Sequence, residues 1–231
     1  MAMSDVKLLG SRTSPYVHRV QIALNIKCIN YEFLEETFGS KSELLLKSNP
    51  VHKMVPVLIH DNKPICESLI IVQYIHEVWT SSGPSILPSD PYDLATALFW
   101  GAFIDDEWSP SVTEAWMARE EEAKATAMER VAEGLALLEE AFVKCSKGKA
   151  FFGGDSIGYL DIAFGSCLGG LRVAENMGGV LLLDEAKTPG LVGWAERFSS
   201  DDSVKDVIIP TEKLIELVKV HQARAKPPIS N

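Results

Sequence analysis

Cysteine is scarce in this chain, and its few copies form no recognisable pairing. The four cysteines lie far apart, with no C-x-x-C and no spacing typical of metal ligands: Cys28, Cys66, Cys145 and Cys167. This distribution argues against a disulfide framework and against a metal site. Reduced thiols in the cytoplasm explain it best.

Long apolar runs and an excess of basic charge are also missing. No apolar stretch approaches the ~18 residues that a membrane helix requires, and residues 1–5 contain no basic segment leading into an apolar core. Asp and Glu outnumber Lys and Arg by 32 to 22, which gives a net charge of −10. That balance disfavours nucleic acid and anionic membranes as partners. We therefore expect a cytoplasmic protein that binds neither.

The chain is long enough for two small domains. Its 231 residues, 46% of them hydrophobic, suffice for one large core or two smaller ones. A cluster of structure-breaking residues at 80–85, followed by two further prolines, indicates a linker. We predict one domain over 1–82, a linker over 83–92 and a second domain over 93–231.

The two predicted domains differ in their hydrophobic patterns. Before the linker, short apolar runs alternate with helical patterns in the order βαβα and then ββα, which predicts a small mixed sheet covered by helices. The expected strands are 6–9, 31–34, 57–59 and 64–66, and the expected helices are 16–27, 42–47 and 68–79.

After the linker, apolar residues recur at spacings of three and four, which predicts a helical bundle. The expected helices are 94–118, 121–145, 159–177, 191–198 and 212–223. At the start of the third helix Asp161 follows Gly158 by three residues, flanked by Ile157 and Ile162 as a hydrophobic staple. We assign this arrangement to folding and not to chemistry.

Three short motifs carry the functional information. A Ser-Pro-Tyr run at 14–16 places a hydroxyl where a helix begins, a Val-Pro step at 55–56 interrupts a strand-like run, and a Glu-Ser pair at 67–68 opens another helix. Each motif alone has an ordinary interpretation, as a helix cap or as a trans proline on an edge strand. Together they indicate a pocket for a small charged thiol peptide.

In this order the motifs resemble the tau class of plant glutathione transferases, and the likeness runs from Val6 to about Lys219. The resemblance implies a thioredoxin-like α/β N-terminal domain followed by an all-α C-terminal bundle. It also implies glutathione as co-substrate with no permanently bound cofactor or metal, small hydrophobic electrophiles as second substrates, a possible peroxidase side activity, and a homodimer. The capping motif resembles that of the family, except that Gly158 replaces the usual Ser or Thr.

The resemblance gives Ser14 the central chemical role. A free thiol has a pKa near ~8.5, and only the thiolate is nucleophilic. A hydroxyl that donates to the sulfur at the positive end of a helix dipole favours the thiolate, and a shift of two pKa units corresponds to ~2.7 kcal/mol. Thr13 is the nearest competing hydroxyl.

The remaining glutathione contacts follow from the same resemblance. Pro56 is implied to be cis, which leaves the main chain of Val55, with Met54 beside it, to pair with the cysteine of glutathione. The carboxylate of Glu67 would bind the γ-glutamyl ammonium, and Ser68 with its helix amide would bind the carboxylate.

Two lysines and a polar network complete the implied site. Lys41 and Lys53 match the positions that hold the glycine carboxylate, although either alone reads as a solvated surface residue. Arg19 and Asp105, together with the Glu-Ser pair, resemble a network that assists thiol ionisation. The acidic run 105–107 departs from relatives that have a lysine after the aspartate, which counts against anionic second substrates.

The second substrate is expected between the domains, against apolar side chains. The candidates are Tyr16, Trp108, Val112, Trp116, Phe164 and Leu168. Each fits the core of the bundle equally well, and for Phe164 and Leu168 the core is the better interpretation.

Two other functions compete with conjugation as interpretations of this sequence. A thiol–disulfide exchanger or dehydroascorbate reductase of the same fold requires a cysteine at position 14, and the sequence has none nearby. A non-catalytic carrier of hormones, pigments or conjugates remains open. The histidines show no pairing that indicates a role: His18, His52, His60, His76 and His221.

Overall fold

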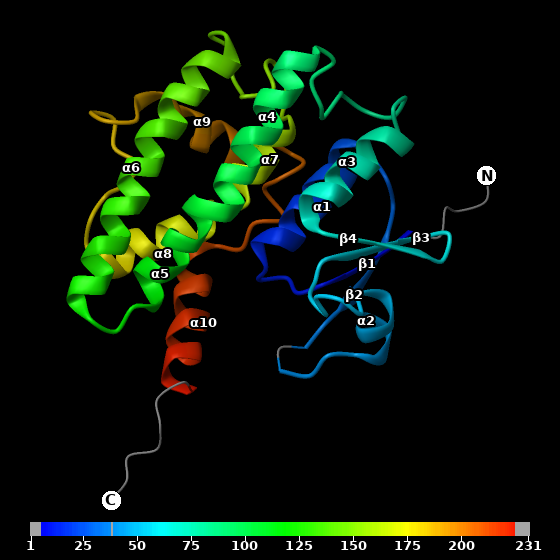
Figure 1. Ribbon diagram of the computed structural model, residues 1–231, viewed down its shortest axis with the longest axis horizontal. Helices are drawn as coiled ribbons and strands as arrows, with labels where there is room; N and C mark the ends of the chain where they lie inside the picture. The colour runs from blue at the N-terminus through cyan, green and yellow to red at the C-terminus, as the bar shows by residue number, and fades with distance from the viewer. Residues whose placement is uncertain (1–5, 38, 225–231) are drawn as a thin grey trace, which may run out of the picture.

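A computed structural model describes residues 6–37 and 39–224 and shows a small sheet with its helices beside a larger group of helices (Figure 1). The ends of the two predicted domains, residues 1–5 and 225–231, lie outside the described residues. The sheet part comes first in the chain and the helical part second, in the predicted order.

The N-terminal part has the predicted βαβα and ββα order. Its strands pair in the order β2-β1-β3-β4, with β1 parallel to β2 and every other pair antiparallel. The elements are β1 (Val6–Gly10), α1 (Pro15–Ile26), β2 (Glu32–Glu35), α2 (Glu43–Ser48), β3 (Val57–His60), β4 (Lys63–Cys66) and α3 (Ser68–Val78). The predicted boundaries were within one or two residues of these.

Alternation along the strands gives the sheet two apolar faces. Leu8 and Leu58 point into the large core that contains the buried residues of α1 and α3. Leu9 and Val57 point to the opposite face, where they pack in a smaller cluster with Leu45 of α2. The sheet is therefore covered on both sides (Figure 1).

The C-terminal part is helical throughout its regular elements. These are α4 (Pro91–Phe103), a π-helical turn η1 (Ile104–Trp108), α5 (Ser109–Met117), α6 (Glu121–Ser146), α7 (Tyr159–Gly165), α8 (Leu168–Gly178), α9 (Pro189–Ser200) and α10 (Thr211–Arg224). Two helices predicted as continuous, 94–118 and 159–177, are interrupted.

The first interruption is the π-helical turn η1. Pro110, in the first turn of α5, has no amide hydrogen, and its ring would collide with the carbonyl of Asp106 in a regular helix. The wider turn just before the proline relieves that conflict. The acidic run 105–107 therefore lies in an irregular turn and not in a regular α-helix.

The second interruption separates α7 from α8 and has a tertiary cause. In a continuous helix the amide of Cys167 would donate to the carbonyl of Ala163, but it donates to Phe164 at 3.0 Å. The carbonyl of Ala163 instead accepts from Nη2 of Arg19 at 3.0 Å. The guanidinium of α1 thus replaces one bond of the helix.

The start of α7 is the capping site expected from the sequence. The fully buried carboxylate of Asp161 accepts from the amides of Gly158 (2.9 Å), Phe152 and Gly153 (2.8 Å each) and from Nε1 of Trp194 (2.7 Å). Since glycine has no side chain, only the aspartate half of a capping box is present. Both flanking isoleucines are buried. Desolvation raises the pKa of Asp161 to about 6, against the effect of the hydrogen bonds.

Candidate functional site

Strand pairing brings the three motifs to one end of the sheet. Leu9 near the end of β1 lies opposite Val57 at the start of β3, and Val57 lies opposite Cys66 at the end of β4. The segment that follows β1, the segment that precedes β3 and the segment that follows β4 therefore meet. These segments contain the Ser-Pro-Tyr run, the Val-Pro step and the Glu-Ser pair.

Ser14 occupies the N-cap position of α1, but its hydroxyl does not cap the helix. Its carbonyl accepts from the amides of Val17 and His18 at 3.1 Å each, and its amide donates to the carbonyl of Ser11 at 3.0 Å. The neighbouring Thr13 hydroxyl pairs with the hydroxyl of Ser11 at 3.2 Å. Within the described loop, the hydroxyl of Ser14 alone is left uncommitted, at the positive end of the helix dipole.

The Val55–Pro56 peptide bond is cis, as the resemblance implied. Among the described residues, neither main-chain polar group of Val55 has a hydrogen-bond partner. The carbonyl of the adjacent Met54, in contrast, accepts from Nδ2 of Asn49 at 3.0 Å. Val55 therefore presents a free donor and a free acceptor to a ligand.

Glu67 and Ser68 lie at the start of α3 but differ in exposure. Glu67 has φ of 71°, a value that is costly for a residue with a side chain and that is concentrated at functional sites. Its exposed carboxylate lies 3.8 Å from Nε2 of His52. The buried hydroxyl of Ser68 accepts from Nη1 of Arg19 at 3.1 Å.

The two lysines proposed for the glycine carboxylate lie on the surface. Lys41 directly precedes the N-cap of α2, and Lys53 lies in the turn before the cis proline with φ of 56°. Both side chains are exposed. Their charges are available to a carboxylate, and no described ion pair occupies them.

Arg19 is the centre of a buried network. Its guanidinium is completely buried and lies 2.7 Å from Oδ1 and 3.0 Å from Oδ2 of Asp105. It also donates to the hydroxyls of Ser68 and Ser166, at 3.1 Å each. The structure thus joins Arg19, Ser68 and Asp105, whereas the carboxylate of Glu67 has no described bond to the network.

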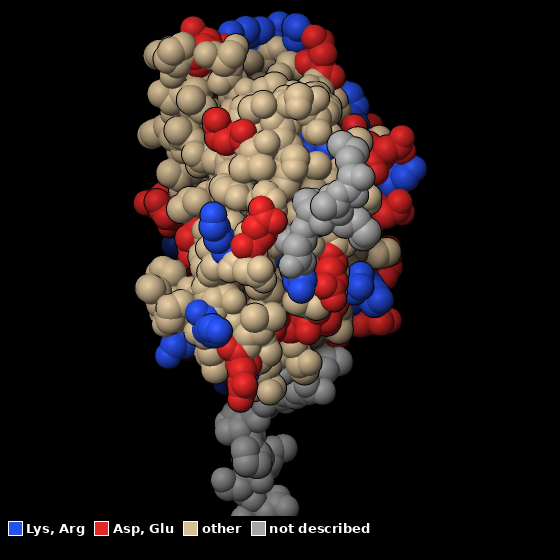
Figure 2. Space-filling view, turned by 90° about the vertical axis from the view of Figure 1, so that its right-hand side faces the viewer, with Lys and Arg blue, Asp and Glu red and all other residues tan. Residues whose placement is uncertain are grey.

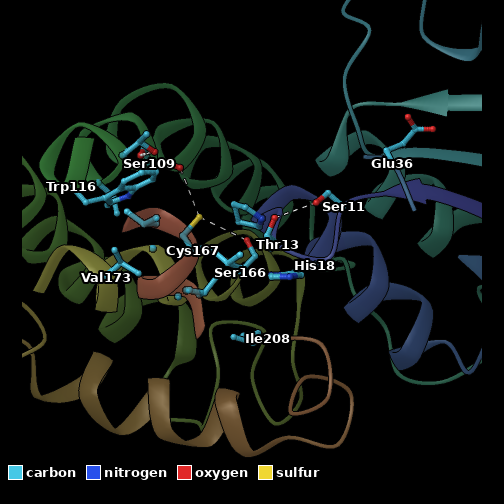
Figure 3. Close-up of a pocket in the computed structure, with 18 of the residues that line it drawn as sticks. Ser11, Thr13, His18, Glu36, Ser109, Trp116, Ser166, Cys167, Val173 and Ile208 are labelled. Carbon is cyan, nitrogen blue, oxygen red and sulfur yellow. Dashed lines mark hydrogen bonds between the residues drawn. The ribbon is translucent and has the colours of Figure 1, made fainter. Parts of the chain in front are cut away.

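A cavity of about 610 Å³ lies between the loop after β1 and the helices α5, α8 and α10. Figure 3 shows Ser11, Thr13 and His18 on one side of it and Ser109, Trp116, Cys167 and Val173 on the other. Its size is in the range of sites for drug-sized ligands. Ser14 is not among the residues of its wall, but both of its chain neighbours are.

The six residues predicted to contact the second substrate lie in different places in the structure. Val112 and Trp116 of α5 line the cavity, together with apolar residues of α10. Tyr16 is not among the residues that line the cavity and is 36% exposed, and partial burial raises the pKa of its hydroxyl while a hydrogen bond with Ser109 opposes this. The ring of Tyr16 also lies 5.0 Å from the guanidinium of Arg19.

The other three candidates lie in the core of the bundle, which agrees with the interpretation preferred from the sequence for Phe164 and Leu168 and corrects the assignment of Trp108 to the cavity. Trp108 is 1% and Phe164 0% exposed, and their rings pack at 5.0 Å. The indole of Trp108 donates to the carbonyl of Val131 at 3.2 Å. Leu168 is buried in the same core. Helical spacing identifies a buried stripe, but it does not say which part of the stripe faces a cavity.

Most residues of the cavity wall were not predicted, and two of them, Cys167 and His18, lie close to the polar part of the site. Cys167 lies on the wall at the break between α7 and α8, and its Sγ lies 3.9 Å from both Nη2 of Arg19 and Oγ of Ser109. The sequence contains no signal for this placement. His18 lies one helical turn after Ser14, so the spacing alone could have placed it beside the loop.

Comparison with known proteins agrees with this geometry. Residues 4–77 match the family described as "Glutathione S-transferase, N-terminal domain" and residues 92–202 match the "Glutathione S-transferase, C-terminal domain". Glutathione S-transferase U17 of Arabidopsis thaliana is 58% identical over 219 residues, covering 95% of this chain and 96% of the relative. Glutathione S-transferase U18 of the same plant is 59% identical over the same shares.

Solved structures give the same result. A tau-class glutathione S-transferase from mango, Mangifera indica, is 62% identical, covers 94% of this chain and 98% of its own, and superposes with a TM-score of 0.90. The chain belongs to the tau-class glutathione S-transferases. A rice enzyme solved in complex with glutathione is 32% identical, covers 98% of this chain and 100% of its own, and has a TM-score of 0.89.

Membership confirms the predicted class of enzyme and the thioredoxin-like and helical fold of this transferase. Its co-substrate is glutathione. Within 6–37 and 39–224 no group of His, Cys, Asp and Glu could hold a metal ion, and no helix there could cross a membrane. The domain boundaries at 82/83 and 92/93 stay predictions.

Proposed function

We propose that this transferase joins the thiolate of glutathione to small hydrophobic electrophiles bound in the 610 Å³ cavity. The observation that carries the proposal is the uncommitted hydroxyl of Ser14 at the start of α1, directly beside that cavity. The hydroxyl donates to the sulfur and, with the helix dipole, lowers the thiol pKa. Stabilising the sulfur anion supplies the nucleophile at neutral pH.

Glutathione is proposed to lie across the end of the sheet where the three motifs meet. Its cysteine pairs with the free main chain of Val55, and its γ-glutamyl ammonium meets the exposed carboxylate of Glu67. The γ-glutamyl carboxylate accepts hydrogen bonds from the amides at the start of α3, beside Ser68. Lys41 and Lys53 neutralise the glycine carboxylate at the other end.

The network around Arg19 is proposed to support ionisation indirectly. The guanidinium of Arg19 donates a hydrogen bond to Ser68, next to the proposed position of the γ-glutamyl group. Asp105 balances the charge of this guanidinium. With its charge balanced in this way, the buried guanidinium acts at the start of α3 through the hydrogen bond that fixes the hydroxyl of Ser68.

The electrophile is proposed to bind against Val112 and Trp116 and under the apolar residues of α10. Holding the two reactants side by side removes much of the entropic barrier to their reaction. Halonitroaromatics, herbicides and reactive carbonyls fit such an apolar wall. Organic hydroperoxides would be reduced by the same thiolate as a side reaction.

Two measurements test the proposal. We expect the thiolate absorbance of glutathione to appear at neutral pH when the protein is saturated with it, and conjugation of a chloronitrobenzene to follow at the same pH. A non-catalytic carrier would instead bind an apolar dye without conjugating any of a panel of electrophiles. Absence of the thiolate absorbance would overturn the proposed chemistry.

We also propose a homodimer in the cytoplasm. Large apolar side chains are exposed on two neighbouring parts of the fold, Ile70 and Val78 on α3 and Tyr92 and Phe99 on α4. The face shown in Figure 2 has charged groups of both signs around a broad, largely uncharged area. Covering such surfaces with a second copy is favourable. The four free cysteines suit a reducing compartment.

Sedimentation tests the dimer, and cell fractionation tests the compartment. We expect a mass near twice that of one chain, and we expect Phe99→Glu to shift the population toward monomer because it buries a charge at the interface. Phe99→Leu is the matched control, since it keeps an apolar side chain. A monomer at all concentrations would contradict the dimer.

A further inference from the structure

The loop that carries Ser14 is held from two sides. On the sheet side, Glu35 of β2 accepts from the amide of Arg12 at 3.2 Å and pairs with the Arg12 guanidinium at 3.0 Å. On the helix side, Nε2 of His18 lies 2.7 Å from the carbonyl of Arg12. One residue of the loop is thus clamped at its amide, its carbonyl and its side chain.

His18 is bound in one tautomer. A carbonyl only accepts hydrogen bonds, so Nε2 carries the proton and donates it to Arg12. The ring is 3% exposed, and burial lowers its pKa, which keeps it neutral. Its Nδ1 is buried and has no partner among the described residues. An unsatisfied buried nitrogen costs stability, so an apolar side chain would serve a purely structural role better.

We propose that His18 is a positioning residue for conjugation, which acts through the carbonyl of Arg12 to set where the hydroxyl of Ser14 meets the sulfur of glutathione. The inference rests on the proposed function of Ser14. Neither His18 nor Arg12 touches the reacting atoms in this role.

The dependence follows from what Ser14 lacks. A capping serine is fixed by its own bond to the helix amides, but the hydroxyl of Ser14 makes no such bond. Its location is therefore set only by the backbone of the short loop between β1 and α1. A displacement of about 1 Å at a reacting group lowers rates by roughly a hundredfold. His18 lies on the wall of the cavity, one turn from Ser14, where it restrains that backbone.

Two amide substitutions test the role without changing the polarity of the site. In His18→Gln the side-chain amide reaches about as far as Nε2 and keeps the bond to Arg12, whereas in His18→Asn it reaches only as far as Nδ1 and loses the bond. We expect His18→Asn to lower kcat by roughly tenfold and to raise the pKa of bound glutathione by about one unit. We expect His18→Gln to remain within about threefold of the parent protein.

His76 provides a matched control. Its Nδ1 accepts from the amides of Ile86 and Leu87 at 3.3 and 3.5 Å, so it also holds main chain, but in the segment between α3 and α4. His76→Leu removes this acceptor and should lower the melting temperature without changing the pKa of bound glutathione. Calorimetric binding of glutathione, measured alongside, separates lost affinity from lost ionisation.

The outcomes are distinguishable. A raised thiol pKa in His18→Asn that His18→Gln restores supports the inference. A parent-like thiol pKa and kcat in His18→Asn overturns it, whatever the melting temperature, and so does an equal rise of the thiol pKa in the two His18 variants. If the parent protein itself gives no thiolate absorbance, the proposed function fails and this inference fails with it.

Discussion

A polar side chain at the start of a helix serves different purposes in α1 and in α7. At α7 the carboxylate of Asp161 accepts four hydrogen bonds, all from the protein, and no solvent reaches it. At α1 the side chain of Ser14 stands at the capping position and makes no hydrogen bond with a described residue. Both sequences look like helix caps. The first terminus is completed by the fold and stabilises it, and the second has an uncommitted hydroxyl, which we propose binds the sulfur of glutathione.

The start of α2 provides a reference for the other two, because its serine is an ordinary N-cap. The hydroxyl of Ser42 accepts from the amide of Leu45 at 3.0 Å, which is an ordinary N-cap on the surface. It shows what Ser14 would do if its role were structural. The contrast teaches that an unsatisfied polar group at a helix start is more informative about function than the residue type.

The largest expected effect is on stability at α7. Asp161→Ala removes the acceptor of three amides and one indole at once, all in a dry environment. We expect the free energy of unfolding to fall by about 3–5 kcal/mol in urea titrations. The affinity of the remaining folded protein for glutathione should not change. A loss below about 1 kcal/mol would show that the terminus of α7 is not held by this carboxylate.

The next effect is on chemistry at α1. Ser14→Ala removes the donor to sulfur, and we expect kcat/KM for chloronitrobenzene to fall about a hundredfold, equivalent to two pKa units of the thiol. The free energy of unfolding should stay within about 0.5 kcal/mol, because no cap bond is lost. Thr13→Ala is the control and should retain most activity. Turnover at the parent rate in Ser14→Ala would remove Ser14 from the mechanism.

A smaller effect appears in the pH dependence of stability. The pKa of Asp161 is raised from 3.8 to about 6 in the fold, so the folded state favours its protonated form. The stability that this proton contributes is complete below the unfolded pKa and is lost as pH rises through the folded one. Relative to Asp161→Asn, the parent protein should lose about 1 kcal/mol between about pH 5 and about pH 7. A constant difference between the two across that interval would contradict the raised pKa.

The smallest effect is expected at α2. Ser42→Ala removes an ordinary cap, and we expect about 1 kcal/mol of lost stability with unchanged kcat. Ser42→Thr should retain most of the stability, because its hydroxyl can accept from the amide of Leu45 and donate to the carboxylate of Glu36, as that of Ser42 does. With Ser14→Ala this completes the comparison, since one serine should affect only stability and the other only catalysis. A drop in kcat for Ser42→Ala would contradict the prediction that Ser42 affects only stability.

Much of the fold could be predicted from local pattern. The alternation before the linker and the spacing of three and four after it placed nearly every element within a few residues. The failures were the two interrupted helices. The break before α8 depends on Arg19, which is 144 positions away from the carbonyl that it occupies. No periodicity within a helix reports such a partner.

The candidate site was predicted in its motifs but not in its walls. Ser14, Val55 and Glu67 were named, and strand register brings their segments together. The sequence could not distinguish the apolar candidates that line the cavity from those in the core. In the structure Trp116 lines the cavity and Trp108 lies in the core. Both tryptophans lie on apolar helical faces, and only the packing of neighbouring helices distinguishes them.

The sequence by itself determined the order of the elements, the three motifs and their family, because these depend on neighbours within a few residues and on strand alternation. Only the tertiary structure decided which polar groups are satisfied. It left the hydroxyl of Ser14 open, saturated the carboxylate of Asp161, and brought His18 and Cys167 to the cavity. Hydrogen-bond satisfaction and burial depend on residues far apart in the chain, so they are properties of the packed molecule.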